Sequence, residues 1–264
     1  MPYDKLSAVV NVILLCLALS LIVVLPMEAF SAVVLGLPLT IRVHQNWLAA
    51  AILVGMACVG TASIMRLHPL SQRGSFASWI LPGLATLLAT ILLPQAPNTI
   101  YTLGGLAVMA IILPLIITAE YRTVDTSAPG YKAVRLSLDL IAYLIALVLF
   151  ALIHGSQAPG LLMAAAALAG SSLLTLDLLC GVQQDIRRTG LYALIVGLVM
   201  GEIVWALSYS KMNSLTAGIF LLLVFYLITG LARQGLLKLL NRRILIEFAV
   251  VALIGLALLL KYAP

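Results

Sequence analysis

Charged residues are scarce in this chain. Asp, Glu, Lys and Arg make up 9% of its 264 residues, whereas hydrophobic residues make up 63%. Soluble domains carry about 25% charged residues because their surfaces face water, so this composition excludes a soluble globule and predicts an integral membrane protein. The net charge of +6 follows from basic residues between apolar runs. It therefore requires no nucleic-acid partner, and we expect none.

Cysteine pairs and the usual catalytic motifs are missing as well. Cys16, Cys58 and Cys180 lie inside or at the end of apolar runs, which is not the pattern of a disulfide framework. The chain has no Gly-rich phosphate loop, no His-Glu-x-x-His, no Gly-x-Ser-x-Gly and no paired Asp-rich motif. His44 and His154 show no ligand spacing. We therefore expect no metal and no cofactor, and the sequence favours a role other than that of an enzyme.

What the chain has is nine apolar runs. Each is about 18 to 24 residues long, and a helix needs about 20 residues to cross a hydrocarbon core about 30 Å thick. The runs cover residues 6–29, 47–65, 76–94, 100–119, 134–153, 160–180, 190–209, 214–232 and 243–261. The longest polar gap, 120–133, is too short to fold alone. The sequence predicts an all-α integral membrane protein, with about nine transmembrane helices in a single multi-pass domain over residues 1–264.

The basic residues fall in every second gap between these runs. Of the 15 Lys and Arg residues, only Arg42, Lys211 and Lys261 occupy the other gaps. The remaining 12 are Lys5, Arg66, Arg73, Arg122, Lys132, Arg135, Arg187, Arg188, Arg233, Lys238, Arg242 and Arg243. Cytoplasmic loops of membrane proteins carry an excess of Lys and Arg, so we predict a cytoplasmic N-terminus. Membrane lipids, whose anionic headgroups attract such loops, are the expected partners, together with other membrane subunits.

An alternating pattern occupies the first predicted outer loop. From residue 33 to residue 43 the odd positions are apolar, and Gly36, Pro38, Thr40 and Arg42 occupy most even ones. A period of two is typical of a half-buried strand, and the Leu-Gly-Leu-Pro sequence at 35–38 supplies turn chemistry. We predict a short outer β-hairpin near residues 31–44. It acts as a structural lid or, alternatively, as a gate or an edge on which a partner docks.

Four stretches of the sequence resemble the landmarks of a known family. They are Leu-Gly-Leu-Pro-Leu at 35–39 before Trp47, Ala-Glu-Tyr-Arg-Thr-Val-Asp at 119–125, Gly-Glu-Ile-Val-Trp-Ala-Leu at 201–207, and Phe225-Tyr226 to Arg233-Gln234. Over most of its length the chain resembles an uncharacterised bacterial family of polytopic membrane proteins. The resemblance implies a bacterial plasma membrane location. It implies no activity, cofactor or ligand.

Carboxylates inside membrane helices indicate function, because each costs at least about 2.5 kcal/mol at a helix centre. Asp139 follows Arg135 by four residues and Glu247 follows Arg243 by four, so both pairs lie on one helix face and predict local ion pairs. Alternatively, the charged residues converge around a vestibule that opens to the cytoplasm. This predicted cytoplasmic polar rim consists of Glu120, Arg122, Asp125, Arg135, Asp139, Asp177, Arg187 and Glu247.

Glu202 stands apart from this rim. It lies about twelve residues, hence about 18 Å, from the inner end of its run, with no basic residue within about eight positions. We predict that it is a ligand or proton site, with a structural hydrogen bond as the alternative. Gly197 and Gly201 precede it as a GxxxG pair, which lets a neighbouring helix approach closely.

Two prolines are candidates for helix kinks. Pro82 lies about six residues into the third run, and Pro114 about six residues before the end of the fourth. Each removes a backbone N–H, and paired interruptions at one depth occur at transporter substrate sites. The alternative is that both prolines are structural, since proline is common in membrane helices.

Three classes of function fit these features. Transport or lipid handling within the bilayer uses the kinks, Glu202 and the polar rim. A non-catalytic accessory or scaffold subunit of a membrane complex uses small-residue helix faces and the outer hairpin. A lipid-modifying membrane enzyme needs its inner carboxylates in one cleft. We favour the first class and keep the other two as alternatives.

Overall fold

The computed structural model describes ten segments of the chain, and they form two compact units. The described residues are 3–22, 28–34, 37–43, 45–67, 77–125, 130–156, 158–181, 186–210, 212–237 and 250. Unit 1 consists of Met1–Gly74 and Ser78–Val134, and unit 2 of Ser75–Ala77 and Arg135–Pro264. The prediction of a single multi-pass domain over residues 1–264 stays a prediction.

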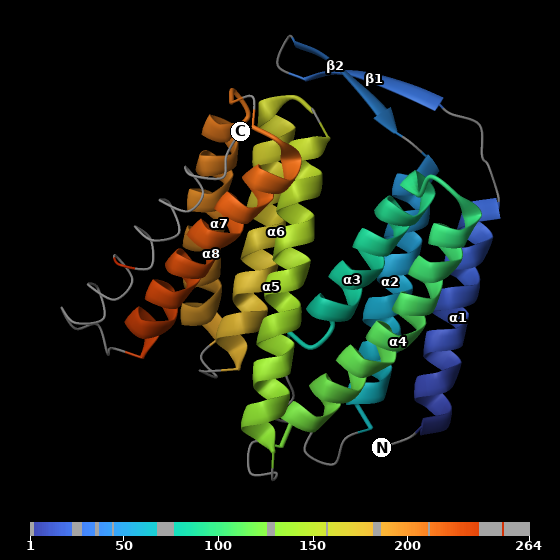
Figure 1. Cartoon of the computed structure of the whole chain (residues 1–264). Coiled ribbons are helices and arrows are strands. Elements are labelled where there is room, and N and C mark those ends of the chain that lie inside the picture. Colours follow the sequence, from blue (N-terminus) through green and yellow to red (C-terminus); the bar gives the residue numbers. More distant parts are fainter. Residues whose placement is uncertain are drawn as a thin grey trace. The chain divides into compact units, whose positions relative to one another are not determined.

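Unit 1 contains helices α1 to α4 and one hairpin (Figure 1). The helices are α1 (Tyr3–Ile22), α2 (Gln45–Met65), α3 (Ile80–Leu92) and α4 (Thr99–Thr123), with the short 3₁₀ helix η2 (Leu93–Gln95) after α3. Helix α2 packs against α1 and α3, and both of these also contact α4. This arrangement encloses an apolar core made of Leu6, Val10, Ile13, Ala57, Ile64, Leu113 and Ile117.

The hairpin of unit 1 consists of strands β1 (Glu28–Val34) and β2 (Leu37–Val43). They pair antiparallel, from Glu28 opposite Val43 to Val34 opposite Leu37. The pairing leaves two residues, 35 and 36, between the strands, which is the shortest common hairpin connection. The placement of this segment on the outer side of a membrane stays a prediction.

The described residues of unit 2 form four long helices. They are α5 (Tyr131–Gly155), whose first turn is assigned to unit 1, α6 (Gly160–Cys180), α7 (Ile186–Leu207) and α8 (Ser214–Leu236). Helix α6 packs along α7, and α8 contacts both of them. Figure 1 shows that successive helices of the unit run in opposite directions. Helices α5 and α7 therefore begin at the end of the unit where α6 and α8 finish.

Seven of the described helices are long and apolar enough to cross a membrane, namely α1, α2 and α4 to α8. They coincide with seven of the nine predicted runs. The ninth run, 243–261, lies outside the described residues except for Val250. The count of nine transmembrane helices is therefore not supported, and the described residues instead contain seven membrane-length helices.

The third predicted run, 76–94, is not a membrane-length helix in the structure. Helix α3 has only 13 residues and gives way to η2, which contains Pro94. Thirteen residues rise about 20 Å, well short of a hydrocarbon core about 30 Å thick. Pro94 has no N–H to donate to the carbonyl of Thr90, so the α-helical ladder cannot continue through it. The apolar run was correctly located, but its hydrophobicity serves burial within the protein, because ten of the 13 residues of α3 are buried.

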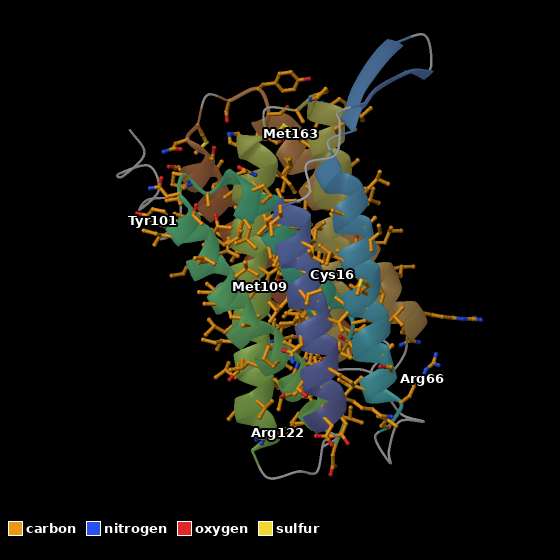
Figure 2. The ribbon with its side chains drawn as sticks, turned by 90° about the vertical axis from the view of Figure 1, so that its right-hand side faces the viewer. Cys16, Arg66, Tyr101, Met109, Arg122 and Met163 are labelled. Atoms are coloured by element: carbon orange, nitrogen blue, oxygen red, sulfur yellow. The ribbon has the colours of Figure 1, made fainter. Side chains whose placement is uncertain are left out.

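Basic residues gather at one end of each unit. Figure 2 shows Arg66 just beyond α2 and Arg122 near the end of α4, whereas Tyr101 lies at the opposite end of α4. In unit 2, Arg135, Arg187 and Arg233 lie within about a turn of helix ends that share one end of the unit. We call that end of unit 2 its basic end. Within each unit, the described basic residues agree with the alternation seen in the sequence.

The core of unit 1 can be tested on α4 alone. Replacing Leu113, which is fully buried, by Ala should lower the free energy of unfolding by about 2 to 5 kcal/mol, because a cavity is left in the core. The matched control is Leu103→Ala on the same helix, where the side chain is 61% exposed and the expected change is below about 0.5 kcal/mol. Thermal unfolding in detergent micelles measures both. Equal losses would mean that Leu113 is not part of a packed core.

Candidate functional site

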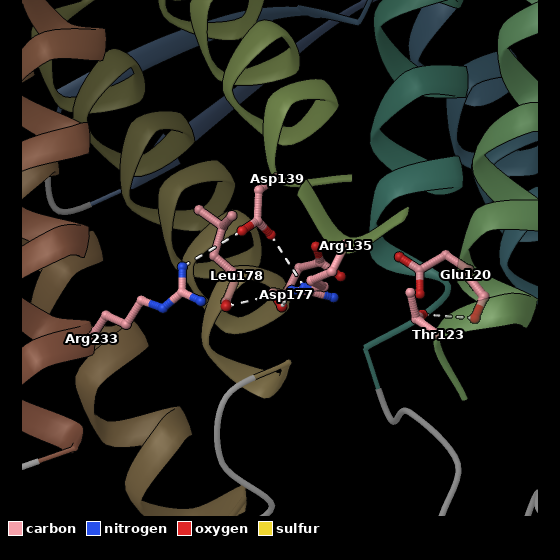
Figure 3. Close-up of polar contacts among 7 residues, drawn as sticks. All are labelled: Glu120, Thr123, Arg135, Asp139, Asp177, Leu178 and Arg233. Atoms are coloured by element: carbon pink, nitrogen blue, oxygen red, sulfur yellow. Dashed lines mark hydrogen bonds and ion pairs between the residues drawn. The ribbon is translucent and has the colours of Figure 1, made fainter. Parts of the chain in front are cut away.

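Four charged side chains meet at the basic end of unit 2 (Figure 3). They are Arg135 and Asp139 on α5, Asp177 on α6 and Arg233 on α8. The Nε of Arg135 lies 3.2 Å from Oδ1 of Asp139, and Nη1 of Arg233 lies 3.5 Å from Oδ2 of the same carboxylate. Asp139 thus bridges two guanidinium groups and joins α5 to α8. The predicted ion pair between Arg135 and Asp139 is confirmed.

Arg135 also caps the C-terminus of α6. Its Nη2 donates to the carbonyl oxygen of Asp177 at 2.7 Å and to that of Leu178 at 3.4 Å. The last four carbonyls of a helix have no partner within the helix, and a cation there also interacts favourably with the helix dipole. Gly181 follows α6, and a Cβ at this position would overlap the guanidinium of Arg135. Glycine at 181 therefore makes room for the cap.

Asp177 is the most buried of the four charged side chains, with 2% of its surface exposed. Its Oδ2 has no hydrogen-bond partner among the described residues, and the same holds for the hydroxyls of Thr175 and Thr189. Most other buried hydroxyls are satisfied within their own helix, as in Thr229, which donates to the carbonyl of Phe225 at 2.6 Å. Unpaired buried polar atoms cost free energy. Unit 2 thus holds polar groups whose hydrogen-bonding capacity is not used by the described residues.

A pocket of about 240 Å³ opens next to this cluster. Its lining comprises Tyr143, Leu178, Leu179, Tyr226, Thr229, Gly230, Arg233 and Gln234, from helices α5, α6 and α8. The ring of Tyr143 packs edge-on against that of Tyr226, with centroids 5.6 Å apart. Leucine side chains and polar groups share the walls, so the pocket is amphipathic. We call it the unit 2 pocket.

Unit 1 has a larger groove, of about 590 Å³, between α1 and α2. Its lining residues are Ala8, Val9, Val12, Ile13, Ile52, Gly55, Met56, Val59 and Gly60. None of these side chains is polar. The groove has the chemistry of a lipid-facing surface and cannot orient a polar ligand.

The predicted polar rim is divided between the two units. Unit 1 contains Glu120, Arg122 and Asp125, and unit 2 contains Arg135, Asp139, Asp177 and Arg187. Glu247, and with it the predicted pair with Arg243, lies outside the described residues. Glu120 is 1% exposed, and the hydroxyl of Thr123 donates to its backbone carbonyl at 2.9 Å (Figure 3). The structure brings together three members of the rim, Arg135, Asp139 and Asp177, and it adds Arg233 to them.

Glu202 lies on the exposed face of α7. It has no hydrogen bond or ion pair to any described residue, and it lines neither of the two pockets. It lies five residues before Leu207, the last residue of α7. It is therefore closer to that end of the helix than the sequence predicted. Gly197 and Gly201 face the other way, since a Cβ at either would crowd the backbone of α6. The predicted close approach of a neighbouring helix is confirmed, but it does not supply Glu202 with a partner.

The two prolines occupy different positions in their helices. Pro82 is the third residue of α3, in the first turn, where an N–H has no acceptor within the helix. A proline there does not interrupt the hydrogen bonding of the helix, so this position gives no support to the predicted kink at Pro82. Pro114 lies inside α4 and removes the N–H that would donate to the carbonyl of Ala110. Pro114 alone remains a kink candidate.

Sequence reasoning did not select the residues that form the unit 2 pocket. The sequence places Arg233 in a basic loop and, with Gln234, in a stretch that resembles a known family, and it indicates no role for Tyr143 or Thr229. A signal was present, because Tyr226, Thr229, Gly230 and Arg233 recur at i, i+3, i+4 and i+7 on one face of a helix. The sequence pattern does not link that face to α5, because the ion pair between Arg233 of α8 and Asp139 of α5 is a tertiary contact.

Loss of Arg135 should destabilise unit 2. Arg135→Leu removes the cap of α6 and leaves Asp139 with Arg233 as its one ion-pair partner among the described residues, so the free energy of unfolding should fall by about 3 kcal/mol or more. Lys132→Leu, at an exposed position one turn earlier on α5, is the control and should change little. Thermal denaturation in detergent distinguishes the two variants. A loss in Arg135→Leu no larger than in the control would contradict the capping role.

Comparison with known proteins identifies the family. No curated protein and no solved structure matches the chain. A family model described as "Protein of unknown function (DUF5656)" matches residues 25–261, a stretch that includes parts of both units. The resemblance to an uncharacterised family is thereby confirmed. The chain is an integral membrane protein with seven membrane-length helices among its described residues, and it belongs to this family of unknown function.

Proposed function

We propose that this protein handles membrane lipids by binding a phospholipid headgroup in the unit 2 pocket. The observation that carries the proposal is the position of Arg233. Its side chain lines the pocket and is 47% exposed, and its ion pair with Asp139 engages only Nη1. A guanidinium has five N–H donors and binds phosphate through two of them at once. Arg233 therefore retains donors for a phosphate that enters the pocket.

The other walls suit the rest of a lipid headgroup. Tyr226 and Gln234 offer hydroxyl and amide groups for phosphate and glycerol oxygens, and Leu178 and Leu179 offer an apolar surface for the first carbons of the acyl chains. At about 240 Å³ the pocket is smaller than the roughly 300–1,000 Å³ of sites for drug-sized ligands. A headgroup fits this volume better than a whole lipid, whose chains would stay in the bilayer.

The electrostatics of the cluster also favour an anionic group. Asp139 is a single carboxylate that serves both Arg135 and Arg233. Arg135 is further engaged by the carbonyls at the end of α6. Arg233, at the pocket wall, therefore shares its counterion with a second cation. A phosphate that binds there completes the neutralisation of Arg233.

The proposal includes an orientation in the membrane. The basic end of unit 2 faces the cytoplasm of a bacterial cell, in line with the excess of Lys and Arg in the same gaps. The N-terminus is cytoplasmic. This orientation puts the unit 2 pocket at the level of the cytoplasmic headgroups.

Transport is less well supported than lipid binding. The transport hypothesis relied on a cavity at Glu202 and on two proline kinks, but Glu202 is exposed on α7 and Pro82 lies in a first turn. The hypothesis of a lipid-modifying enzyme needs several carboxylates in one cleft, and no Asp or Glu lines the unit 2 pocket. We therefore restrict the proposal to lipid binding.

Replacing Arg233 tests the proposal. Arg233→Gln should reduce phospholipid binding about tenfold or more, because the charged donors for the phosphate are lost. Arg233→Lys keeps the charge without the two-pronged geometry and should give an intermediate loss. Binding is measured as the exchange of a spin-labelled anionic phospholipid into nanodiscs that contain the purified protein.

Arg122→Gln is the matched control. Arg122 is exposed near the end of α4 in unit 1 and has no part in the unit 2 pocket. Its loss should leave lipid binding unchanged. Equal binding by wild type and Arg233→Gln, with the fold intact by circular dichroism, would refute headgroup binding at this pocket.

A further inference from the structure

Gln234 brings a neutral hydrogen-bonding group to the unit 2 pocket. It lines the pocket and is half-buried, one residue after Arg233 and two residues before Leu236, the last residue of α8. Its side-chain amide makes no hydrogen bond to any described residue. An amide carries two N–H donors and an oxygen that accepts. The pocket thus contains an unused group that both donates and accepts, next to the cation that is proposed to bind phosphate.

The order of the lining residues along α8 puts Gln234 on the headgroup side of Arg233. The lining runs from Tyr226 to Gln234, which are eight residues and hence about 12 Å apart along the helix axis. The acyl chains of a lipid whose phosphate lies at Arg233 extend toward the middle of the membrane, which is the direction of Tyr226. The alcohol esterified to the phosphate lies on the opposite side, where α8 ends. Gln234 is therefore placed to contact that alcohol.

An ammonium group finds no free anion in this pocket. None of the described lining residues is Asp or Glu. Asp139, which lies beside the pocket, already pairs with Arg135 and Arg233. The rings of Tyr143 and Tyr226 pack edge-on with centroids 5.6 Å apart, so they leave no space between them that would enclose a cation. The pocket therefore suits the phosphate ester of an uncharged alcohol better than that of an amino alcohol.

Two adjacent hydroxyls match the amide of Gln234. One hydroxyl donates to Oε1 while its neighbour accepts from the Nε2 amino group, whereas an ammonium group only donates and leaves the amino group unpaired. We propose that the unit 2 pocket selects phospholipids with a diol in the headgroup, such as phosphatidylglycerol. Gln234 binds the diol and Arg233 binds the phosphate. This inference rests on the proposed headgroup binding and adds the class of lipid.

Two anionic lipids of equal charge test the role of the diol. Phosphatidylglycerol and phosphatidylmethanol are both singly charged phosphodiesters, but only phosphatidylglycerol has headgroup hydroxyls. Each is titrated into phosphatidylcholine nanodiscs that contain the purified protein, and displacement of the spin-labelled lipid gives the relative affinity. Wild type should bind phosphatidylglycerol about fivefold to tenfold more tightly, because the amide gains two hydrogen bonds.

This comparison separates the diol from headgroup binding itself. Equal affinities for the two lipids, both reduced in Arg233→Gln, would overturn the selection of a diol and leave the proposed headgroup binding intact. Affinities that Arg233→Gln leaves unchanged would overturn both, because the phosphate would then bind elsewhere.

Variants of Gln234 test which residue recognises the diol. Gln234→Leu should abolish the preference and keep the affinity for phosphatidylmethanol within about twofold of wild type, since that lipid does not use the amide. Gln234→Glu, whose carboxylate only accepts, should shift the preference toward phosphatidylethanolamine. Gln95→Leu is the matched control, because Gln95 is exposed in η2 of unit 1 and lines neither of the two pockets. A preference that survives in Gln234→Leu would overturn the role of Gln234.

The free headgroup distinguishes a lipid from a soluble phosphodiester. Glycerophosphoglycerol carries the same phosphate and diol without acyl chains. It should displace the labelled lipid at least about tenfold less well than phosphatidylglycerol, because the apolar surface of Leu178 and Leu179 then gains no contact. Equal displacement by the two compounds at the same total concentration would overturn the assignment of a lipid.

Discussion

A peptide group in the hydrocarbon interior of a membrane has no water to bond, so its N–H and C=O must be satisfied by the protein itself. The described parts of the chain meet this constraint with long helices, and in α3 and η2 with a short buried element. The constraint also accounts for the hydroxyls, because Thr61, Thr86 and Thr229 each donate to the carbonyl four residues earlier. Other polar groups are satisfied near helix ends, by side chains of neighbouring helices.

The basic end of unit 2 is such a place. The last carbonyls of α6 need donors, and Arg135 on the neighbouring helix supplies them. Once Arg135 is fixed there, its second partner Asp139 is fixed too, and Asp139 in turn holds Arg233 of α8. The capping of one helix thus positions a cation on another. The unit 2 pocket lies beside that cation, so a structural need and a candidate binding site share the same residues.

Much of this could be predicted from local patterns. Apolar runs located seven membrane-length helices, and the i,i+4 spacing located the ion pair of Arg135 and Asp139. The helix formed by 76–94 was predicted too long, since hydropathy measures burial in lipid and burial in protein alike. Pro82 was read as an interruption, although its effect depends on whether it lies in a first turn or in a helix interior. The contacts of Arg233 were missed because its partner is 94 residues away, on a different helix.

By itself, the sequence determined that this is a helical membrane protein, which residues fall at the helix ends, and that Glu202 is out of place in an apolar run. These properties follow from hydropathy and from spacing along one helix, which are local. Only the tertiary structure decided which charged residues meet, which wall Arg233 lines, and that Glu202 faces away from α6. Those outcomes depend on how the helices pack and rotate against one another, and the sum of many small side-chain contacts sets that rotation.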